Sequence, residues 1–430
     1  MLVFLIHRIL DKSILSKGTN DVSFSLILYS LVEIQLFLLY NLRLENVYEF
    51  LEVEMVYLDY AAATEVEDRV LDLFCDTEKK YFANPNSNHK LGIEAKKMID
   101  YYTKNIASLL SLSDDEIIYT SGASESNNLA VKGICERYKS RGKHILISAF
   151  EHNSILSSVE VMQKNGYDVD VIPVNKDGII DIEVLKSMIR DDTILVSICA
   201  VDSEIGLIQP IEEIGKILKK MPNCHFHSDL SQAVGKINFN CENIDLITIS
   251  PHKFFGLPGI GMLIKKKNIG LVTQINGGIS TTIYRSGTPV LSLIASCFLA
   301  IKLALEKMDE KYSYVKNLSD KIKLRLSEYP KVFINSRSNC IPHIINFSFQ
   351  GVNSLIVQKR LEKYDIYVST KTSCCPINTP SKLVYALTKD KSLATSAIRL
   401  SISNKTTKAE IDYFLSAFDN IYKELVNEKI

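Results

Sequence analysis

The chain has 430 residues, of which 46% are hydrophobic and 23% charged, as in soluble globular proteins large enough for two or three structural units. Lysine plus arginine equals aspartate plus glutamate at 50 each, so the formal net charge is zero. This balance excludes the basic excess of an electrostatic nucleic-acid binder, and we expect no direct nucleic-acid binding.

Residues 1–54 differ from the rest of the chain. Their apolar run 24–40 is interrupted by Glu33 and Gln35 and is marginal in length for a membrane span. A signal peptide is not indicated, because few basic residues precede the run and no small-residue cleavage site follows it. The segment is an added helical segment, a membrane anchor, or translated sequence upstream of the natural start at Met55. The position of Met55 directly before VYLDYAAAT favours the third interpretation, so we expect no membrane association.

Short apolar strands alternate with helical segments from about residue 116 onward. This pattern predicts an α/β domain over residues 70–308, with a mainly parallel mixed sheet between helices. The strands are expected at DEIIYT (115–120), HILISAF (144–150), YDVDVIPV (167–174), TILVSICAV (193–201), HFHSD (225–229), DLITIS (245–250) and GMLIKKK (261–267).

A different pattern follows a long helix that is expected over residues 291–310. Strands are expected at HIINFSF (343–349), IYVST (366–370) and IRLSIS (398–403), and helices at 354–364 and 407–425. Thr407 and Glu410 form a capping box for the last helix. We therefore expect a smaller α+β domain over residues 309–430, with residues 55–69 packing near it.

Polar residues follow several of the predicted strands at the point where each strand ends. They are the Gly/Ser turn SGASES (121–126), Glu151 with His152, the segment DSEIG (202–206), Asp229 with Gln232, and His252 with Lys253. Taken singly, the turn and the aspartate are more often helix caps and the histidine more often structural. Together they bring a phosphate cradle, a histidine, an aspartate, a glutamine and a lysine to one edge of one sheet.

A phosphate cradle, a lysine and an aspartate are what pyridoxal 5′-phosphate (PLP) requires. The lysine amine forms a Schiff base with the aldehyde, the aspartate keeps the pyridine nitrogen protonated, and backbone amides with hydroxyls hold the phosphate. A histidine can stack on the ring. Other phosphate chemistry fits less well, because neither GxxxxGK[ST] nor GxGxxG occurs.

The chain has nine cysteines, most of them inside apolar runs. Buried free thiols indicate a reducing compartment, so we expect a cytoplasmic protein. No CxxC pair or zinc-like Cys/His spacing occurs, and no metal is expected. Only Cys374 and Cys375, beside Pro376, lack an apolar setting.

The sequence resembles the cysteine desulfurases of the class V aminotransferase group, PLP enzymes of fold type I. The resemblance covers roughly residues 56–424 and rests on motifs that are specific in combination. They are YLDYAAAT, NPNSNH, TSGASESNNLAVKG, EH at 151–152, SDLSQAVGK, SPHKFFGLPGIG, RSGTP and SAIRLSIS.

The resemblance implies roles for single residues. Lys253 would carry the cofactor and remove the substrate Cα proton, with His152 stacking on the ring and assisting proton transfer. Asp229 would pair with the pyridinium nitrogen and Gln232 with the phenolic oxygen. Ser203 stands where the family has a ring-contacting asparagine. The phosphate ligands would be Ala123, Ser124, Ser250, His252 and, from the neighbouring subunit of a homodimer, Thr288.

The resemblance also implies the substrate site and the nucleophile. Arg399 would clamp the carboxylate of L-cysteine, for which its planar guanidinium is suited, with Asn84 nearby. Counting forward from the strand at 366–370, Cys374 takes the position of the family's nucleophile. It would accept the sulfur as a persulfide while alanine leaves, and a sulfur-acceptor protein for iron–sulfur clusters or tRNA thiolation would follow. The return of this loop is one residue shorter than in many relatives, so counting backward selects Ser373 instead.

Three departures from the family pattern leave alternatives open. Ser203 replaces the asparagine, the stretch 276–284 lacks the usual glutamate, and Lys371 replaces a glycine. The alternatives are a selenocysteine lyase, another β-lyase or an aminotransferase of the same fold, or a PLP-binding scaffold with little activity. A loop cysteine favours sulfur chemistry, because transamination needs no thiol.

Overall fold

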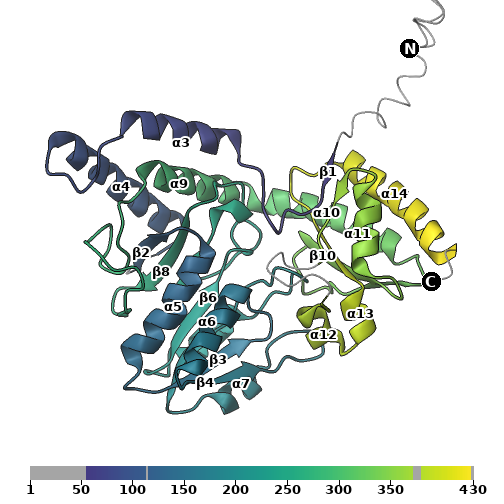
Figure 1. Cartoon of the computed structure of the whole chain (residues 1–430), viewed down its shortest axis with the longest axis horizontal. Coiled ribbons are helices and arrows are strands. Elements are labelled where there is room, and N and C mark those ends of the chain that lie inside the picture. The colour runs from purple at the N-terminus through teal and green to yellow at the C-terminus, as the bar shows by residue number, and fades with distance from the viewer. Residues whose placement is uncertain (1–54, 113–114, 371–378, 428–430) are drawn as a thin grey trace, which may run out of the picture. The chain divides into compact units, whose positions relative to one another are not determined.

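The computed structural model describes residues 55–112, 115–370 and 379–427. The chain divides into Met1–Glu54 and a compact unit Met55–Ile430. All of the described residues belong to the second unit (Figure 1). Cys374, Cys375 and Lys371 lie outside the described residues.

A seven-stranded sheet forms the centre of this unit, with strand order β2-β8-β7-β6-β5-β3-β4. Its strands are β2 (Asp115–Thr120), β3 (His144–Ser148), β4 (Asp168–Ile172), β5 (Thr193–Ser197), β6 (His225–Asp229), β7 (Leu246–Ile249) and β8 (Gly261–Lys266). Neighbouring strands are parallel from β4 through to β7, and β8 runs antiparallel to both β7 and β2. The predicted mainly parallel mixed sheet is therefore confirmed.

Helices cover both faces of the sheet. They are α3 (Asp68–Lys80), α4 (Lys90–Leu109), α5 (Ala123–Tyr138), α6 (Asn153–Lys164), α7 (Ile182–Met188), α8 (Ile211–Leu218) and α9 (Leu291–Leu305). Along β3, Leu146 packs in a core with α4, α8 and α9 residues, while Ile145 and Ile147 pack in a second core with α5 and α6. Successive side chains of a strand point to opposite faces, so apolar residues at consecutive positions fill two cores.

The C-terminal part builds a three-stranded antiparallel sheet of order β12-β10-β9. Its strands are β9 (Val332–Ile334), β10 (Ile344–Phe349) and β12 (Ala397–Ser401), and its helices are α10 (Met308–Leu326), α11 (Ser354–Glu362), α12 (Lys382–Thr388), α13 (Lys391–Thr395) and α14 (Lys408–Asn427). Strand β1 (Val56–Tyr57) pairs in parallel with β11 (Ile366–Tyr367), which brings residues 55–57 next to this part.

Two local predictions can be compared directly with the structure. The capping box is confirmed, since the Thr407 N–H donates to Glu410 Oε2 at 2.6 Å and the Glu410 N–H to Thr407 Oγ1 at 3.1 Å. The single helix over 291–310 is wrong: α9 ends at Leu305 and α10 begins at Met308, because Lys307 adopts a left-handed conformation with φ 52°. Among the described residues, no helix is long and apolar enough to cross a membrane.

Candidate functional site

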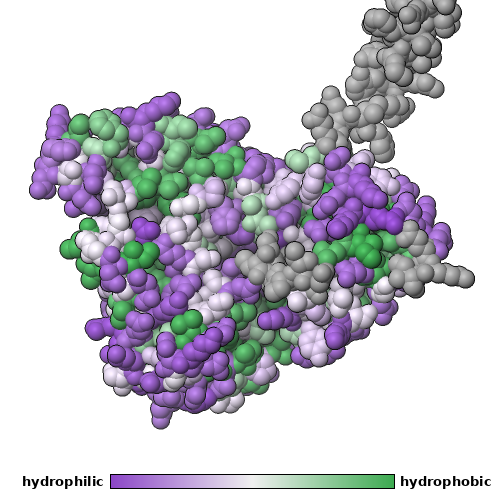
Figure 2. Space-filling view, in the orientation of Figure 1, coloured by the Kyte–Doolittle hydropathy of each residue, from purple (hydrophilic) through white to green (hydrophobic). Residues whose placement is uncertain are grey.

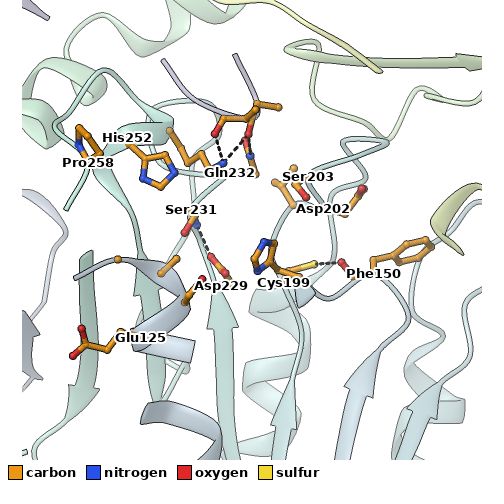
Figure 3. A pocket seen from close by; sticks show the side chains of 18 of the residues that line it. Glu125, Phe150, Cys199, Asp202, Ser203, Asp229, Ser231, Gln232, His252 and Pro258 are labelled. Carbon is orange, nitrogen blue, oxygen red and sulfur yellow. Dashed lines mark hydrogen bonds between the residues drawn. The ribbon is translucent and has the colours of Figure 1, made fainter. Parts of the chain in front are cut away.

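A cavity of about 460 Å³ lies at the carboxyl ends of the central parallel strands (Figure 3). Its position follows from the fold, because loops at this edge of an open α/β sheet leave room for a ligand. Nine of the residues predicted for the site line it: Ala123, Ser124, His152, Ser203, Asp229, Gln232, His252, Lys253 and Arg399.

Lys253 stands at the end of the short helix η2 (Pro251–Lys253), which follows β7 directly. Its Nζ donates hydrogen bonds to the carbonyl oxygens of Ala61 at 2.9 Å and Ala62 at 2.6 Å. The Thr64 N–H donates to the His252 carbonyl at 3.0 Å. The AAAT part of the first family motif is thus held against the lysine.

Asp229 closes β6, and two donors fix its carboxylate (Figure 3). Ser231 N–H donates to Oδ1 at 2.9 Å, and Asn127 Nδ2 donates to Oδ2 at 2.9 Å. Asn127 comes from α5 and was missed by the sequence analysis, although it lies within the TSGASESNNLAVKG motif. The carboxylate is therefore presented to the cavity in one orientation.

His152 caps the N-terminus of α6, with Nδ1 accepting from the Ser154 N–H at 3.2 Å. Burial lowers the pKa of His152, the Lys253 charge lowers it further, and Asp229 acts in the opposite direction. The imidazole is therefore neutral near pH 7, which suits a ring that stacks on a flat ligand.

The turn between β2 and α5 contains the residues predicted for the phosphate cradle. It contributes Ser121, Gly122, Ala123 and Ser124 to the cavity wall at the start of a 16-residue helix. Backbone N–H groups at a helix N-terminus bind phosphate. A Cβ on Gly261, the first residue of β8, would lie 2.5 Å from the carbonyl carbon of Gly122, so this close approach requires glycine.

Arg399 lies in β12 and is 1% exposed. Its Nη2 donates to Asp59 Oδ1 at 2.6 Å and its Nη1 to the Ser203 carbonyl at 2.8 Å, while Nε is buried without a hydrogen-bond partner among the described residues. A buried donor without a partner is costly, so its presence at a cavity points to an anionic ligand. Asp59, which also accepts from Ser369 Oγ at 2.9 Å, was not predicted as a site residue.

Three predicted residues in the described part of the chain do not line this cavity. Ser250 Oγ lies 2.9 Å from His252 Nδ1 and so contacts a lining residue. Asn84 Oδ1 accepts from the Asn86 N–H at 2.9 Å in its own turn. Thr288 lines an adjacent cavity of about 100 Å³ together with Ser121 and Gly259.

Cys199 lines the cavity but was read from the sequence only as a buried thiol. Its Sγ donates to the Phe150 carbonyl at 3.4 Å (Figure 3), and its N–H donates to Glu151 Oε1 at 2.7 Å. Burial, with the nearby Glu151, raises the pKa of Cys199 well above its ordinary value. Its thiol stays protonated near pH 7, which makes it a poor nucleophile.

Asp202 has a structural role in the DSEIG segment, in which Ser203 departs from the family pattern. Its carboxylate is buried and accepts the N–H groups of Glu204, Ile205 and Leu207 at 2.8, 2.7 and 2.6 Å. These bonds order the turn that follows β5. We therefore interpret Asp202 as a structural residue, although it reaches the cavity wall.

The donor set of the cavity fits PLP. Lys253 would hold the aldehyde carbon, Asp229 the pyridine nitrogen and the turn 121–124 the phosphate. The bound group supplies an electron sink for reactions at the Cα of an amino acid. The fold and the site together define a PLP-dependent enzyme of the α/β type.

Comparison with known proteins identifies the family. The family model described as Aminotransferase class-V matches residues 56–414. A NifS/IcsS protein homolog of Lactobacillus delbrueckii is 38% identical over 380 residues, covering 86% of this chain and 97% of the relative. A cysteine desulfurase IscS of Dictyoglomus turgidum is 36% identical over 378 residues, covering 86% and 95%.

A solved NifS-like protein has the same fold, with a TM-score of 0.80 and 32% sequence identity over 86% of this chain and 99% of that chain. The chain belongs to the class V aminotransferase family. It therefore has PLP as its cofactor and the architecture of fold type I, as the sequence predicted.

Proposed function

We propose that this chain is a cysteine desulfurase that converts L-cysteine to L-alanine and captures the sulfur as a persulfide on Cys374. The observation that carries the proposal is Arg399, a buried guanidinium at the wall of the cavity that Lys253 also lines, whose Nε has no partner in the part of the chain that the structure describes. This donor suits the α-carboxylate of an amino acid. The names of the related proteins support the choice of cysteine.

The residues divide the work as follows. Arg399 binds the carboxylate and so orients the Cα–H bond toward Lys253, whose amine removes and returns the proton. The neutral His152 stacks on the ring and assists proton transfer. The Cys374 thiolate attacks the substrate sulfur, the carbon–sulfur bond breaks, and the product carbon is protonated to alanine.

The sulfur then leaves on an acceptor. We propose a sulfur-acceptor protein of iron–sulfur cluster assembly or tRNA thiolation, because IscS and NifS relatives match most of the chain. Seven free cysteines in the described part, six of them buried, support a reducing, cytoplasmic location.

We also propose a homodimer with Thr288 reaching the phosphate of the neighbouring subunit. Two observations support it. Thr288 lies beside, and not in, the cavity of its own chain. Large apolar side chains are exposed on α3, α4 and the turn between them, where Figure 2 shows hydrophobic surface: Leu71, Phe82, Leu91, Ile93 and Tyr101.

The test is turnover of L-cysteine by the purified, PLP-loaded chain, measured as alanine and sulfide. We expect both products, and mass spectrometry of the cysteine-treated protein should place one extra sulfur on Cys374. Cys374→Ser should abolish alanine release while leaving the absorbance of the bound cofactor intact. The matched neighbour Cys375→Ser should retain turnover.

Three outcomes decide against parts of this proposal. No alanine from cysteine, with turnover of selenocysteine or another amino acid, would identify a different enzyme of the family. An active Cys374→Ser variant with the extra sulfur on Cys375 would reassign the nucleophile. A borohydride-trapped cofactor adduct in Lys253→Ala would reassign the lysine.

A further inference from the structure

Lys236 lies close to the cavity but has been given no role so far. It ends the turn that follows β6, four residues after Gln232, and its Nζ donates to Gln232 Oε1 at 2.7 Å. The oxygen of the Gln232 amide is therefore turned toward Lys236.

Because Oε1 faces Lys236, the amide nitrogen of Gln232 faces away from Lys236. Gln232 Nε2 donates to the Ala61 carbonyl at 2.9 Å, the same oxygen that accepts from Lys253 Nζ at 2.9 Å. A primary amide carries two N–H donors, and Gln232 lines the 460 Å³ cavity. Among the described residues, Nε2 has the Ala61 carbonyl as its acceptor, which leaves its second N–H for a ligand oxygen in the cavity.

A second, smaller cavity of about 40 Å³ adjoins Lys236. Lys236, Lys253, Lys311 and His343 line it, and its lining includes no acidic residue among the described part of the chain. No carboxylate of the described residues therefore pairs with Lys236 across this cavity. The position of Lys236 favours the Gln232 oxygen as the acceptor of its hydrogen bond.

We propose that Lys236 is a positioning residue: it fixes the Gln232 amide so that its nitrogen donates to the phenolic oxygen of the cofactor. The proposal rests on the cofactor placement given above. A donor to a phenolate stabilises its charged form and makes it a weaker base. With the cofactor bound, such a donor would lower the pH at which the cofactor, held by Lys253, loses its proton.

The charged groups around Lys236 act in known directions. Burial, then Lys253 and Arg399, lower the pKa of Lys236 to about 7, and both the charged and the neutral amine can donate to Gln232. Burial lowers the pKa of His252 to about 4 and that of His343 to about 3, so both are neutral near pH 7. The carboxylates that line the larger cavity are those of Glu125, Asp202 and Asp229.

The test is the visible absorbance of the PLP-loaded protein as a function of pH, a readout that needs no turnover. We expect Lys236→Met to raise the midpoint by about one pH unit, a tenfold change in proton dissociation, because the amide is free to rotate. Lys236→Arg, which keeps a donor, should restore the midpoint. Lys311→Met, whose Nζ donates to the Leu303 carbonyl, removes a charge from the same cavity and should leave the midpoint unchanged.

A double-mutant cycle separates positioning from charge. Gln232→Ala should raise the midpoint, and adding Lys236→Met to it should have no further effect. An unchanged midpoint in Lys236→Met, an equal shift in Lys311→Met, or additive shifts in the double variant would each overturn the proposal. If Lys236→Met does not fold, Lys236→Leu, which also lacks a donor, replaces it in the same comparison. A failed desulfurase assay with the expected titration would reject the proposed function but not this role.

Discussion

Arg399 shows how a single buried residue ties the proposed substrate site to the two parts of the fold. Its guanidinium bonds to Asp59 from the first family motif and to Ser203 from the turn after β5. Its backbone N–H donates to the Ser369 carbonyl at 2.7 Å. The position of the guanidinium is thus set from three separate segments, and a carboxylate that binds it is set as well.

We expect Arg399→Lys to raise the KM for L-cysteine by roughly 10- to 100-fold, with a smaller effect on kcat. Lysine keeps the charge but loses the planar fork, and a charge-assisted hydrogen bond contributes about 1.5–3 kcal/mol. Steady-state kinetics give the two constants, and cofactor absorbance checks that the site is intact. The control is the same substitution at Arg337, which forms an exposed ion pair with Asp177 outside the cavity. A KM within twofold of the natural chain's would contradict the assigned carboxylate site.

Residue identities in the site could be predicted from the sequence, but their partners could not. Lys253 and Asp229 stand in recognisable motifs at strand ends, and Arg399 stands in a motif within β12. The Asp59–Arg399 pair joins residues 340 positions apart, and the Asn127–Asp229 pair joins residues 102 apart. Such contacts depend on the order of strands in the sheets, which the spacing of motifs does not give.

At the scale of secondary structure, the close approach of β8 to the β2–α5 turn shapes the phosphate cradle. Gly261 pairs with Thr120 across the two antiparallel strands. The position that a Cβ on Gly261 would take lies against the backbone of Gly122 in the cradle. The direction of β8 was not predictable, because a buried apolar strand has the same composition whether it runs parallel or antiparallel. The end of α9 before Lys307 could not be predicted either, because a lysine in a left-handed conformation leaves no signal in the sequence.

We expect Gly261→Ala both to weaken PLP binding and to destabilise the fold. The added Cβ would lie 2.5 to 2.9 Å from three backbone atoms of Gly122, so the cradle must move. Fluorescence titration of the apoprotein with PLP should show at least a tenfold higher Kd, while urea unfolding of the apoprotein changes by about 1–3 kcal/mol, as for other overpacked sites. An unaltered Kd would show that the cradle does not bind the phosphate.

At the scale of the whole molecule, buried histidines make stability depend on pH. Burial lowers the pKa of His225, His227 and His252 to about 4 and that of His343 to about 3. Between these values and about 6.5 the unfolded chain binds more protons than the folded chain, so the histidines' contribution is fully present above pH 6.5 and is lost as pH falls. Glu151, whose pKa burial raises to about 8, acts in the opposite direction above about pH 4.5.

The His343 contribution can be isolated by comparing His343→Gln with the natural chain. When the pH is lowered from 5.5 to 4.5, we expect the free energy of unfolding to fall by about 1.4 kcal/mol less in the variant than in the natural chain. The reason is that the variant takes up one fewer proton on unfolding. Urea unfolding at pH 4.5, 5.5 and 7.5 measures this difference. Parallel pH profiles for the two chains would mean that His343 is not held neutral.

The proposed homodimer makes a prediction that a monomer cannot satisfy. If Thr288 of one subunit binds the phosphate in the other, then Lys253 and Thr288 of one site belong to different chains.

Lys253→Ala and Thr288→Asp should each be inactive alone, the second because a carboxylate repels the phosphate. Co-expressed with different affinity tags and purified through both, the mixed dimer contains one site with both residues intact. We expect it to regain about half of the natural activity per dimer. A dimer without recovered activity would place Thr288 in its own chain's site, and sedimentation as a monomer would reject the shared site altogether.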